Sequence, residues 1–322
     1  MAITRADVLA KIPAGKRNAP SVPTSEILEL VFGTSMHSLP GTVADALKDL
    51  DREARVLYST QGYPADKPSD DALKNCHGKW SEPLFAITAW NTLAGINSAS
   101  DDYFYVYVKL PPKKSKKTEW LSLLNENCSK AIRNFDLDST HPVVAKSAHT
   151  KLTLIASNPD AVILKFPKDQ LPSFALSLDP SKALGSFDVS TLEKMDTLYE
   201  SFIKKVTPSS NLVCFVSLKT STRPDRKYQF LNEGNHVKSV LMYLYAMKAD
   251  KGLTTEFFSN RYFAVCLTKV TDADREAMDC AMSAYISAPM ISPLWSVDKL
   301  YESLSFTDIP TCVNDIMTKA KF

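Results

Sequence analysis

Residues 217–234, SLKTSTRPDRKYQFLNEG, combine a lysine, a distant carboxylate and an R-P-D-R cluster of two arginines flanking an aspartate. Lys219 ends the apolar run NLVCFVSLK, and Glu233 follows it by fourteen positions. The run predicts a buried strand, because both of its faces are apolar. The residues from Gln229 onward have apolar side chains at helical spacing, and Pro224 suits the first turn of a helix. This stretch therefore predicts a strand, a turn and a helix that act as one rigid element.

Strand and helix patterns alternate on both sides of this stretch, from residue 101 to about residue 290. Apolar and β-branched runs predict strands, and apolar residues at three- and four-residue spacing predict helices. The predicted strands are 103–110, two runs within 151–166 that are broken at Asn158-Pro159, 211–220 and 261–270. The predicted helices are 118–135, 191–206, 229–248 and 272–287. This order predicts an α/β fold with a central mixed β-sheet flanked by helices.

The N-terminal part of the chain has a different texture. Residues 1–100 are predicted to be mainly helical, and residues 101–322 are predicted to form the α/β core. Helical spacing covers residues 24–33, 42–58 and 78–95, with a Pro- and Asp-rich loop at 62–72 between the last two. Thr24 or Ser25 offers a cap for the first helix.

Composition excludes several classes of protein. The 322 residues are 44% hydrophobic, enough for a large core, and could form one large domain or two small ones. A net charge of +2 means that a nucleic-acid surface would have to be local. The N-terminus has no apolar signal core, and no run is long enough to cross a membrane, so a cytoplasmic protein is expected. A Gly-rich phosphate loop is absent, which argues against a nucleotide cofactor.

The cysteines fit the same picture. None forms a C-x-x-C pair, and several lie in apolar runs such as FAVCL, so we expect reduced core residues and no zinc site. The six are Cys76, Cys128, Cys214, Cys266, Cys280 and Cys312. His77 beside Cys76 has no partner at a metal-site spacing. The lysine run at 113–117 could contact phosphates, although such a run is usually a solvated loop.

Two charged residues stand where strands are predicted to begin or end. Asp160 follows Pro159 and precedes the apolar run AVILKF, so its carboxylate is expected to be exposed but rigidly held. Lys219 has a similar place at the end of its own strand. Either one alone is ordinary. Together they match the needs of a nuclease, which uses carboxylates to hold Mg²⁺ and a cation beside the scissile phosphate.

The set Pro159-Asp160, Ser217-x-Lys219 and Glu233 resembles the PD-(D/E)xK nuclease superfamily in a variant form. The usual acid two residues before the lysine is replaced by Ser217, and an acid stands instead at Glu233 on the following helix. With R-P-D-R between them, this pattern is similar to the CCGG family of type II restriction endonucleases that cut RCCGGY. Residues 75–84, NCHGKWSEPL, resemble the segment of that family whose glutamate joins the active site, which maps to Glu82.

The resemblance implies a restriction-endonuclease-like core and a Mg²⁺-dependent enzyme that cuts both strands of duplex DNA at a short palindrome with a CCGG-type core. It implies that Asp160, Glu233 and Glu82 bind the metal, that Ser217 occupies the vacated acid position, and that Lys219 assists the attacking water. It also implies 5′-phosphate products and a homodimer or homotetramer. The flanking base pairs, an interrupted core such as CCNGG, the cut position and the choice between dimer and tetramer stay open.

Hydrogen-bond chemistry gives the R-P-D-R cluster a role. Guanine offers two acceptors, O6 and N7, to a guanidinium, whereas the N4 amino group of cytosine needs an acceptor such as a carboxylate. Arg223 and Arg226 can therefore read guanines while Asp225 reads cytosines, and a two-fold dimer doubles the contacts. A plain salt-bridge cluster is the structural alternative.

Two other functions remain as alternatives. A sequence-specific DNA-binding protein without cleavage activity would keep the fold and the cluster, but it gives no reason for Asp160, Lys219 and Glu233. A repair or structure-specific nuclease of the same superfamily gives no reason for R-P-D-R. Incubating plasmid DNA with and without Mg²⁺ separates the first from a nuclease, and the cleavage positions separate the second.

Overall fold

A computed structural model describes residues 3–14, 21–33, 39, 41–111, 120–133, 137–138, 151–152, 158–220, 224–281 and 294–320. For residues 137–138, 151–152 and 224–227 it describes the backbone. The described residues contain a five-stranded sheet of order β1-β4-β5-β6-β7 and a two-stranded one, β2-β3. The strands are β1 (Tyr103–Lys109), β2 (Leu137–Asp138), β3 (Lys151–Leu152), β4 (Ala161–Pro167), β5 (Leu212–Lys219), β6 (Tyr262–Cys266) and β7 (Lys299–Glu302).

The large sheet is mixed, as predicted. β1 and β4 pair antiparallel, as do β4 and β5, whereas β5 and β6, and β6 and β7, pair parallel. All five residues of β6 and all but the last of β5 are buried, which explains their continuous apolar sequences. Because β4 and β5 are antiparallel, the beginning of β4 lies beside the end of β5. This pairing brings Asp160 and Lys219 to one edge of the sheet.

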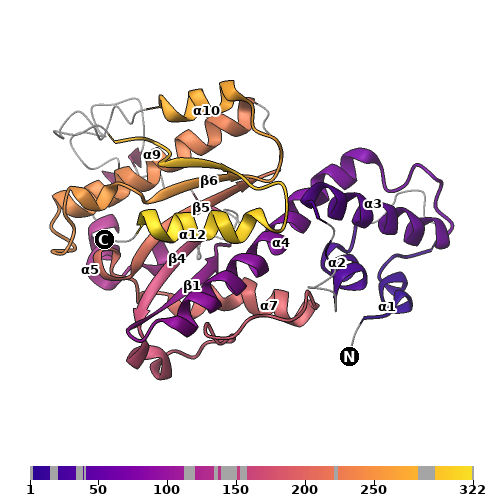
Figure 1. Cartoon of the computed structure of the whole chain (residues 1–322), viewed down its shortest axis with the longest axis horizontal. Coiled ribbons are helices and arrows are strands. Elements are labelled where there is room, and N and C mark those ends of the chain that lie inside the picture. The colour runs from indigo at the N-terminus through magenta and orange to yellow at the C-terminus, as the bar shows by residue number, and fades with distance from the viewer. Residues whose placement is uncertain are drawn as a thin grey trace.

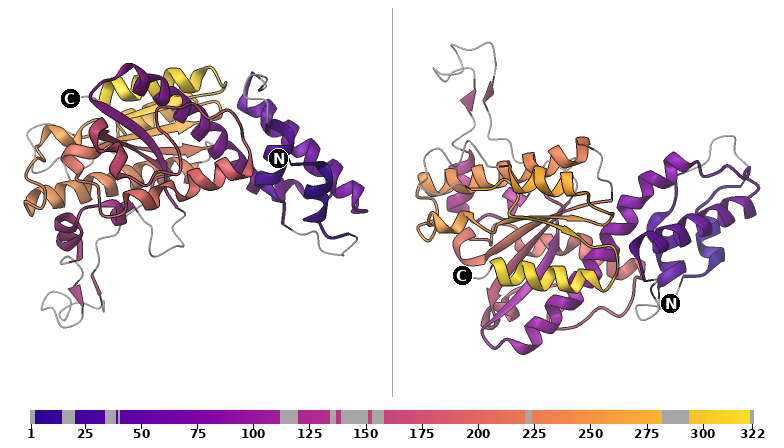
Figure 2. Two further views of the ribbon diagram at one scale, coloured as in Figure 1. Left: turned by 90° about the horizontal axis from the view of Figure 1, so that it is seen from below. Right: turned by 45° about the horizontal axis from the view of Figure 1, so that its top comes forward.

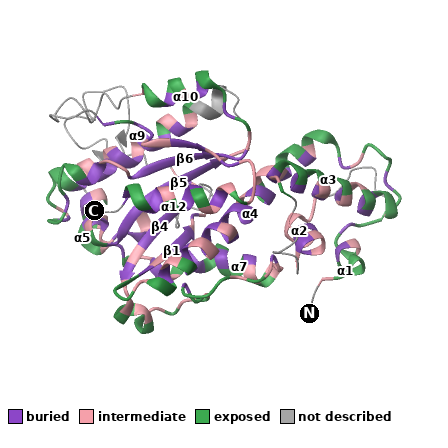
Figure 3. Cartoon of the chain, in the orientation of Figure 1, coloured by how far each residue is buried: buried purple, intermediate pink, exposed green. Residues whose placement is uncertain are grey.

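Helices cover both faces of the sheet (Figures 1 and 2). α4 (Asp70–Ala99) and α12 (Asp308–Ala320) lie side by side on one face. α9 (Pro224–Ala246) lies on the other, where it contacts β6 and α5 (Glu126–Arg133). Figure 3 shows the strands as the most continuously buried part of the chain, between these two layers. A helix from each face can therefore bring side chains to the same edge of the sheet.

The N-terminal helices gather to one side of the sheet (Figure 1). They are α1 (Arg5–Ala10), α2 (Thr24–Phe32) and α3 (Val43–Thr60). α4 joins the two parts, because its beginning packs on α2 and α3 and its later turns pack on β1 and α12. Ser69 caps α4 by accepting a hydrogen bond from the N–H of Ala72.

The remaining described helices are short: α7 (Val189–Thr197), α8 (Pro208–Asn211), α10 (Asp272–Asp279) and the 3₁₀ turns Trp120–Leu123, Lys168–Ser173, Leu198–Phe202 and Glu256–Phe258. The predicted helix 118–135 is wrong as a single helix. Leu124 forms a β-bridge to Val206, and Asn125 then caps α5 by accepting from the N–H of Cys128. The predicted helix 191–206 likewise gives way to a 3₁₀ turn at Leu198.

Two smaller predictions about helix starts also fail. Pro23 is the N-cap of α2, so Thr24 is already helical, and neither Thr24 nor Ser25 acts as the cap. α4 begins at Asp70, inside the loop predicted for 62–72, because Ser69 provides the cap and two acidic residues occupy the first turn. The structure also adds β7 and α12, which the sequence patterns did not indicate.

α9 is held tightly against the sheet and the segment before β7. A Cβ atom at Gly234 would lie 1.9 Å from the carbonyl oxygen of Ser296, so only glycine allows this approach. One turn later, the fully buried Lys238 donates to Asp298 Oδ1 at 2.7 Å and to the carbonyl oxygen of Trp295 at 2.6 Å. These contacts fix the helix that carries Glu233.

Candidate active site

Asp160 and Lys219 meet at the edge where β4 begins and β5 ends. The Asp160 Oδ2 atom accepts from the N–H of Leu218 at 2.6 Å and lies 3.5 Å from Lys219 Nζ. The Asp160 carbonyl accepts from the N–H of Leu110, so the residue is tied to both neighbouring strands. Lys219 Nζ also lies 5.6 Å from the centre of the Phe230 ring on α9. The aspartate is thus rigidly held and the lysine is directed toward it.

Glu233 is buried on the side of α9 that faces the sheet, with 3% of its surface exposed. Its Oε2 atom accepts from Ser217 Oγ at 2.5 Å and from the hydroxyl of Tyr262 at 2.8 Å. Its Oε1 atom accepts from Gln229 Nε2 at 2.9 Å. The pKa of Tyr262 is raised well above its usual value by burial and then by Glu233, so the phenol keeps its proton and donates. The carboxylate therefore lies next to Ser217 on β5.

Glu82 comes from α4, on the opposite face of the sheet from α9. Burial raises the pKa of this carboxyl, and the charge of Asp160 raises it further, while Lys109 and Lys219 act in the opposite direction. Lys109, the last residue of β1, lies 3.7 Å from Glu82 and donates to Asp196 of α7 at 2.7 Å. The Asp160 carboxylate is therefore close enough to Glu82 to raise the pKa of that carboxyl.

Two cavities meet at these residues and form one groove. The larger, of 860 Å³, is lined by Glu82, Asp160 and Glu233, together with Lys79, Lys109, Asp196 and His236. The other, of 610 Å³, is lined by Glu82, Asp160 and Lys219, together with Lys74, Asn75, His77 and Gly78 of α4. Because Glu82, Asp160 and Gln229 line both, the groove passes directly over the predicted site.

The donor set of the groove suits a hard divalent cation, which prefers carboxylate oxygens. In the part of the chain that the structure describes, no three acidic, histidine or cysteine side chains gather closely enough to hold a metal between them. Mg²⁺ does not need such a cage, since it is usually held by one or two carboxylates with waters and phosphate oxygens. The residues present therefore fit a metal that is completed by the substrate.

The predicted recognition cluster is only partly within the described residues. Arg223 and the lysine run 113–117 lie outside them. Asp225 and Arg226 lie in the first turn of α9, and their side chains are outside the description. Pro224 begins the helix, as predicted. Since each helical residue rises about 1.5 Å, Asp225 and Glu233 are separated by about 12 Å along the axis.

The family of the chain follows from comparison with known proteins. The model of the Cfr10I/Bse634I restriction endonuclease family matches residues 39–319. The chain belongs to this family.

The Cfr10I/Bse634I family match extends well beyond residues 75–245, where the motifs lie. Among curated proteins, the type II restriction enzyme Cfr10I of Citrobacter freundii is 26% identical over 254 residues, covering 78% of this chain and 80% of that protein. Bse634I with cognate DNA has a similar fold, with a TM-score of 0.74, 22% identity and coverage of 95% of this chain and 97% of that one. Bse634I alone gives the same TM-score and identity.

The chain is thus a type II restriction endonuclease, a site-specific deoxyribonuclease that binds DNA. Restriction endonucleases generally use a divalent metal ion. The predicted fold class is confirmed by the mixed sheet, the flanking helices and the fold shared with Bse634I. No helix in the described ranges is both long and apolar enough to span a membrane.

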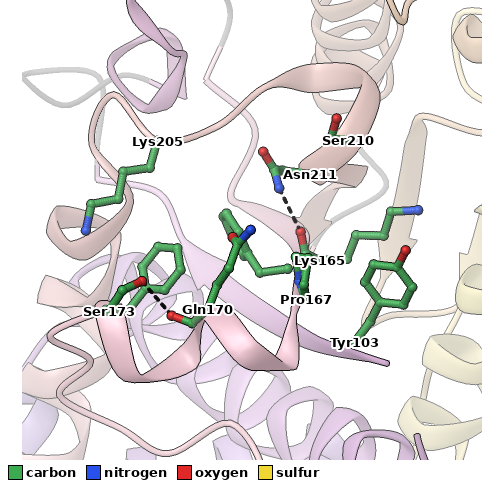
Figure 4. Close-up of a pocket in the computed structure, with 10 residues that line it drawn as sticks. Tyr103, Lys165, Pro167, Gln170, Ser173, Lys205, Ser210 and Asn211 are labelled. Atoms are coloured by element: carbon green, nitrogen blue, oxygen red, sulfur yellow. Dashed lines mark hydrogen bonds between the residues drawn. The ribbon is translucent and has the colours of Figure 1, made fainter. Parts of the chain in front are cut away.

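Another hollow, of 610 Å³, lies at the opposite end of β4 from Asp160 (Figure 4). Its two lysines end on opposite sides of the hollow. Lys165 lies over the ring of Tyr103 and Lys205 over that of Phe174, at 5.5 and 4.6 Å from the ring centres. The two ammonium groups therefore do not converge on one ligand.

Sequence reasoning missed four residues of the groove and its walls: Lys109, Asp196, Gln229 and Tyr262. Gln229 could have been found, because it precedes Glu233 by one helical turn. Tyr262 and Asp196 had no local signal, since each reaches the site from a distant part of the chain.

His77 and the cysteines do not form a metal site among the described residues. His77 pairs with Asp51 at 3.0 Å, which links α4 to α3. Five of the cysteines are buried, Cys280 is exposed, and all six are free thiols.

Proposed function

We propose that this enzyme hydrolyses both strands of duplex DNA within a short palindrome that has a CCGG-type core, using Mg²⁺ and leaving 5′-phosphates. Asp160 and Glu233 would hold the metal, and Glu82 would act as an outer carboxylate. Lys219 would orient the attacking water and stabilise the charge that develops on the scissile phosphate. Residues 101–322 would form the catalytic and recognition core, and the mainly helical region 1–100 would contribute Glu82.

The observation that carries this proposal is the contact between Ser217 Oγ and Glu233 Oε2 at 2.5 Å. Ser217 stands two residues before Lys219, where the superfamily usually has its acid. The Glu233 carboxylate, which comes from α9, thus lies beside the position where the superfamily acid would stand. Asp160, Glu233 and Glu82 line one cavity from three separate elements. This arrangement supports the proposal that Glu233 takes the role of the displaced acid.

Asp160, Glu233 and Lys219 would each have a separate role in the reaction. A bound Mg²⁺ supplies charge stabilisation on the phosphate and increases the acidity of water. Asp160 lines the groove, and its Oδ2 atom is fixed by the Leu218 N–H. Glu233 would use Oε1, because Oε2 already accepts two hydrogen bonds. Lys219 orients the water and stabilises the developing charge as the P–O3′ bond breaks and the new P–O bond forms.

Recognition would come from the first turn of α9 and the residue before it. Arg223 and Arg226 would each bind a guanine edge, and Asp225 would accept from cytosine N4. Bse634I has been solved with its cognate DNA, which supports a DNA-reading role for this fold. A homodimer would read both halves of the palindrome, and a homotetramer would engage two sites.

Digestion of plasmid DNA tests the proposed reaction. We expect double-strand cleavage at discrete sites with Mg²⁺, and no cleavage with EDTA or with Ca²⁺ in its place. Sequencing the ends should give 5′-phosphates and a shared CCGG-type core, and it also yields the flanking bases and the cut position. Cleavage at DNA ends or lesions instead of a shared sequence would contradict the proposal.

The displaced acid can be tested by moving it back. Glu233→Gln should lower the cleavage rate by at least about a hundredfold, because it removes a charge at the reacting centre. Adding Ser217→Glu should restore part of the rate, since the two side chains are in contact. The matched control is Ser217→Gln with Glu233→Gln, which has the same size without the charge. Equal rates for both double variants would show that the two positions do not serve the same metal.

A further inference from the structure

Ser217 and Tyr262 approach Glu233 from adjacent parallel strands. Ser217 is paired with Ala264 in the register of β5 and β6, so Tyr262, two residues before Ala264, projects from the same face of the sheet. That face is covered by α9, and both hydroxyl groups donate to the same oxygen, Glu233 Oε2. The other oxygen, Oε1, accepts a hydrogen bond from Gln229 Nε2, and both Gln229 and Glu233 line the groove. The two strands thus hold the carboxylate through Oε2, and Oε1 is left to the side chain of Gln229 at the groove.

The ring of Tyr262 is fully buried and closely fitted against α9. A Cβ atom at Gly234, the residue after Glu233, would lie 2.9 Å from Tyr262 Cδ1. Glycine at this position therefore lets the ring lie against the helix backbone. This packing helps to direct the hydroxyl toward Glu233, because the buried ring lies directly against the helix that carries the glutamate.

The backbone of Tyr262 is fixed from the same helix. Asp298 Oδ2 accepts from the N–H groups of Arg261 and Tyr262, both at 2.8 Å. Its Oδ1 atom accepts from Lys238 Nζ, five residues beyond Glu233 on α9. Tyr262 is therefore connected to α9 twice, through its hydroxyl to Glu233 and through Asp298 to Lys238. A displacement of the carboxylate relative to β6 would break this set of contacts.

We propose that Tyr262 is a positioning residue for the metal-binding acid, which holds Glu233 Oε2 so that Oε1 faces the groove. The proposal rests on the proposed role of Glu233. A ligand oxygen must be placed within about 0.5 Å to act well, and an unsupported glutamate side chain has several rotamers. Without the phenol, Oε2 keeps only Ser217 as a donor among the described contacts, and the carboxylate can turn toward it.

The test is Tyr262→Phe, which removes one oxygen atom and keeps the ring that packs on Gly234. The matched control is Tyr301→Phe on β7, whose hydroxyl donates to the carboxylate of Asp315 at 2.8 Å and which does not line the groove. Both variants lose a tyrosine hydrogen bond to a carboxylate, which is buried for Tyr262 and partly buried for Tyr301, so both should lower the thermal stability. If the role of Tyr262 were purely structural, the two variants would also behave alike in metal binding and in the Mg²⁺ dependence of cleavage.

Two readouts distinguish positioning from structure. We expect Tyr262→Phe to need about tenfold more Mg²⁺ for half-maximal cleavage, a change of one factor of ten in apparent affinity. Direct binding of Mn²⁺ to the enzyme, followed by the loss of the free-ion electron paramagnetic resonance signal, should weaken similarly. Tyr301→Phe should leave both values at those of the wild type. Equal values for the two variants would overturn the proposal.

Glu233→Gln separates failure of this inference from failure of the proposed function. In that background, adding Tyr262→Phe should produce no further loss of Mn²⁺ binding, because the group being positioned is already changed. If Glu233→Gln alone leaves Mn²⁺ binding and cleavage unchanged, the assignment of Glu233 itself is wrong. If it lowers both while Tyr262→Phe matches Tyr301→Phe, only the positioning role is wrong.

Discussion

Lys219→Ala is expected to slow DNA cleavage by about a thousandfold while specific DNA binding persists. Only 11% of the lysine side chain is exposed, and its ammonium group lies 3.5 Å from Asp160 at the floor of the groove. Loss of one preorganised charge or donor at a reacting centre typically lowers the rate by about a hundred- to a thousandfold. Rates are measured in single-turnover cleavage with Mg²⁺, and binding is measured with Ca²⁺.

A matched control for Lys219→Ala is Lys205→Ala. Both lysines lie over an aromatic ring, Phe230 for Lys219 and Phe174 for Lys205, but Lys205 lines the hollow at the far end of β4. The control should cut DNA at the wild-type rate. Normal cutting by Lys219→Ala, with the control also normal, would refute the assignment of the active site to this edge of the sheet.

Arg226→Ala is expected to weaken specific DNA binding by about 2 to 6 kcal/mol. A good bidentate contact to guanine contributes about 1 to 3 kcal/mol of discrimination, and a symmetric dimer loses the contact twice. The measurement is competition in Ca²⁺ between a duplex with a CCGG core and its single-base variants. A simple phosphate contact would behave differently, because its loss lowers affinity evenly for all sequences.

Asp225→Asn gives the more selective version of this experiment. The amide keeps the shape of the side chain but turns a donor toward the cytosine amino group, so preference for the CC half should collapse. Affinity for unrelated sequences should stay equal or rise slightly, since one negative charge is removed near the phosphates. Full CCGG preference in this variant would mean that the cluster is an intramolecular salt bridge.

Much of the core was predictable because its signals are local. The strand at 212–219 is a continuous apolar run ending in Lys219, and Asp160 follows a proline at the start of a strand. Both patterns predict strand ends without knowledge of the partner strand. The pairing that joins the two ends is antiparallel and brings residues 59 positions apart into contact. The sequence alone could suggest this meeting only through resemblance to a known motif.

The parts that failed depend on contacts from elsewhere in the chain. The helix predicted for 118–135 is divided because Leu124 pairs with Val206, which helical spacing cannot reveal. Tyr262 is read correctly as a strand residue, but its hydroxyl finds Glu233 only because α9 crosses β6 at Gly234. Glu82 was located through resemblance, and its closeness to Asp160 depends on the packing of α4 against β1.

The course of α9 limits how an enzyme of this design can acquire a new target. Each residue turns a helix by about 100°, so inserting or deleting one residue between Arg226 and Glu233 would rotate the proposed reading side chains away from the DNA or the acid away from β5. Gly234 and Asn235, which contact Ser296, and Lys238, which donates to Asp298, fix the half of the helix that carries Glu233. Related enzymes with altered specificity should therefore differ by substitutions that keep the length of this helix. The spacing between the proposed recognition residues and Glu233 should be the same in all of them.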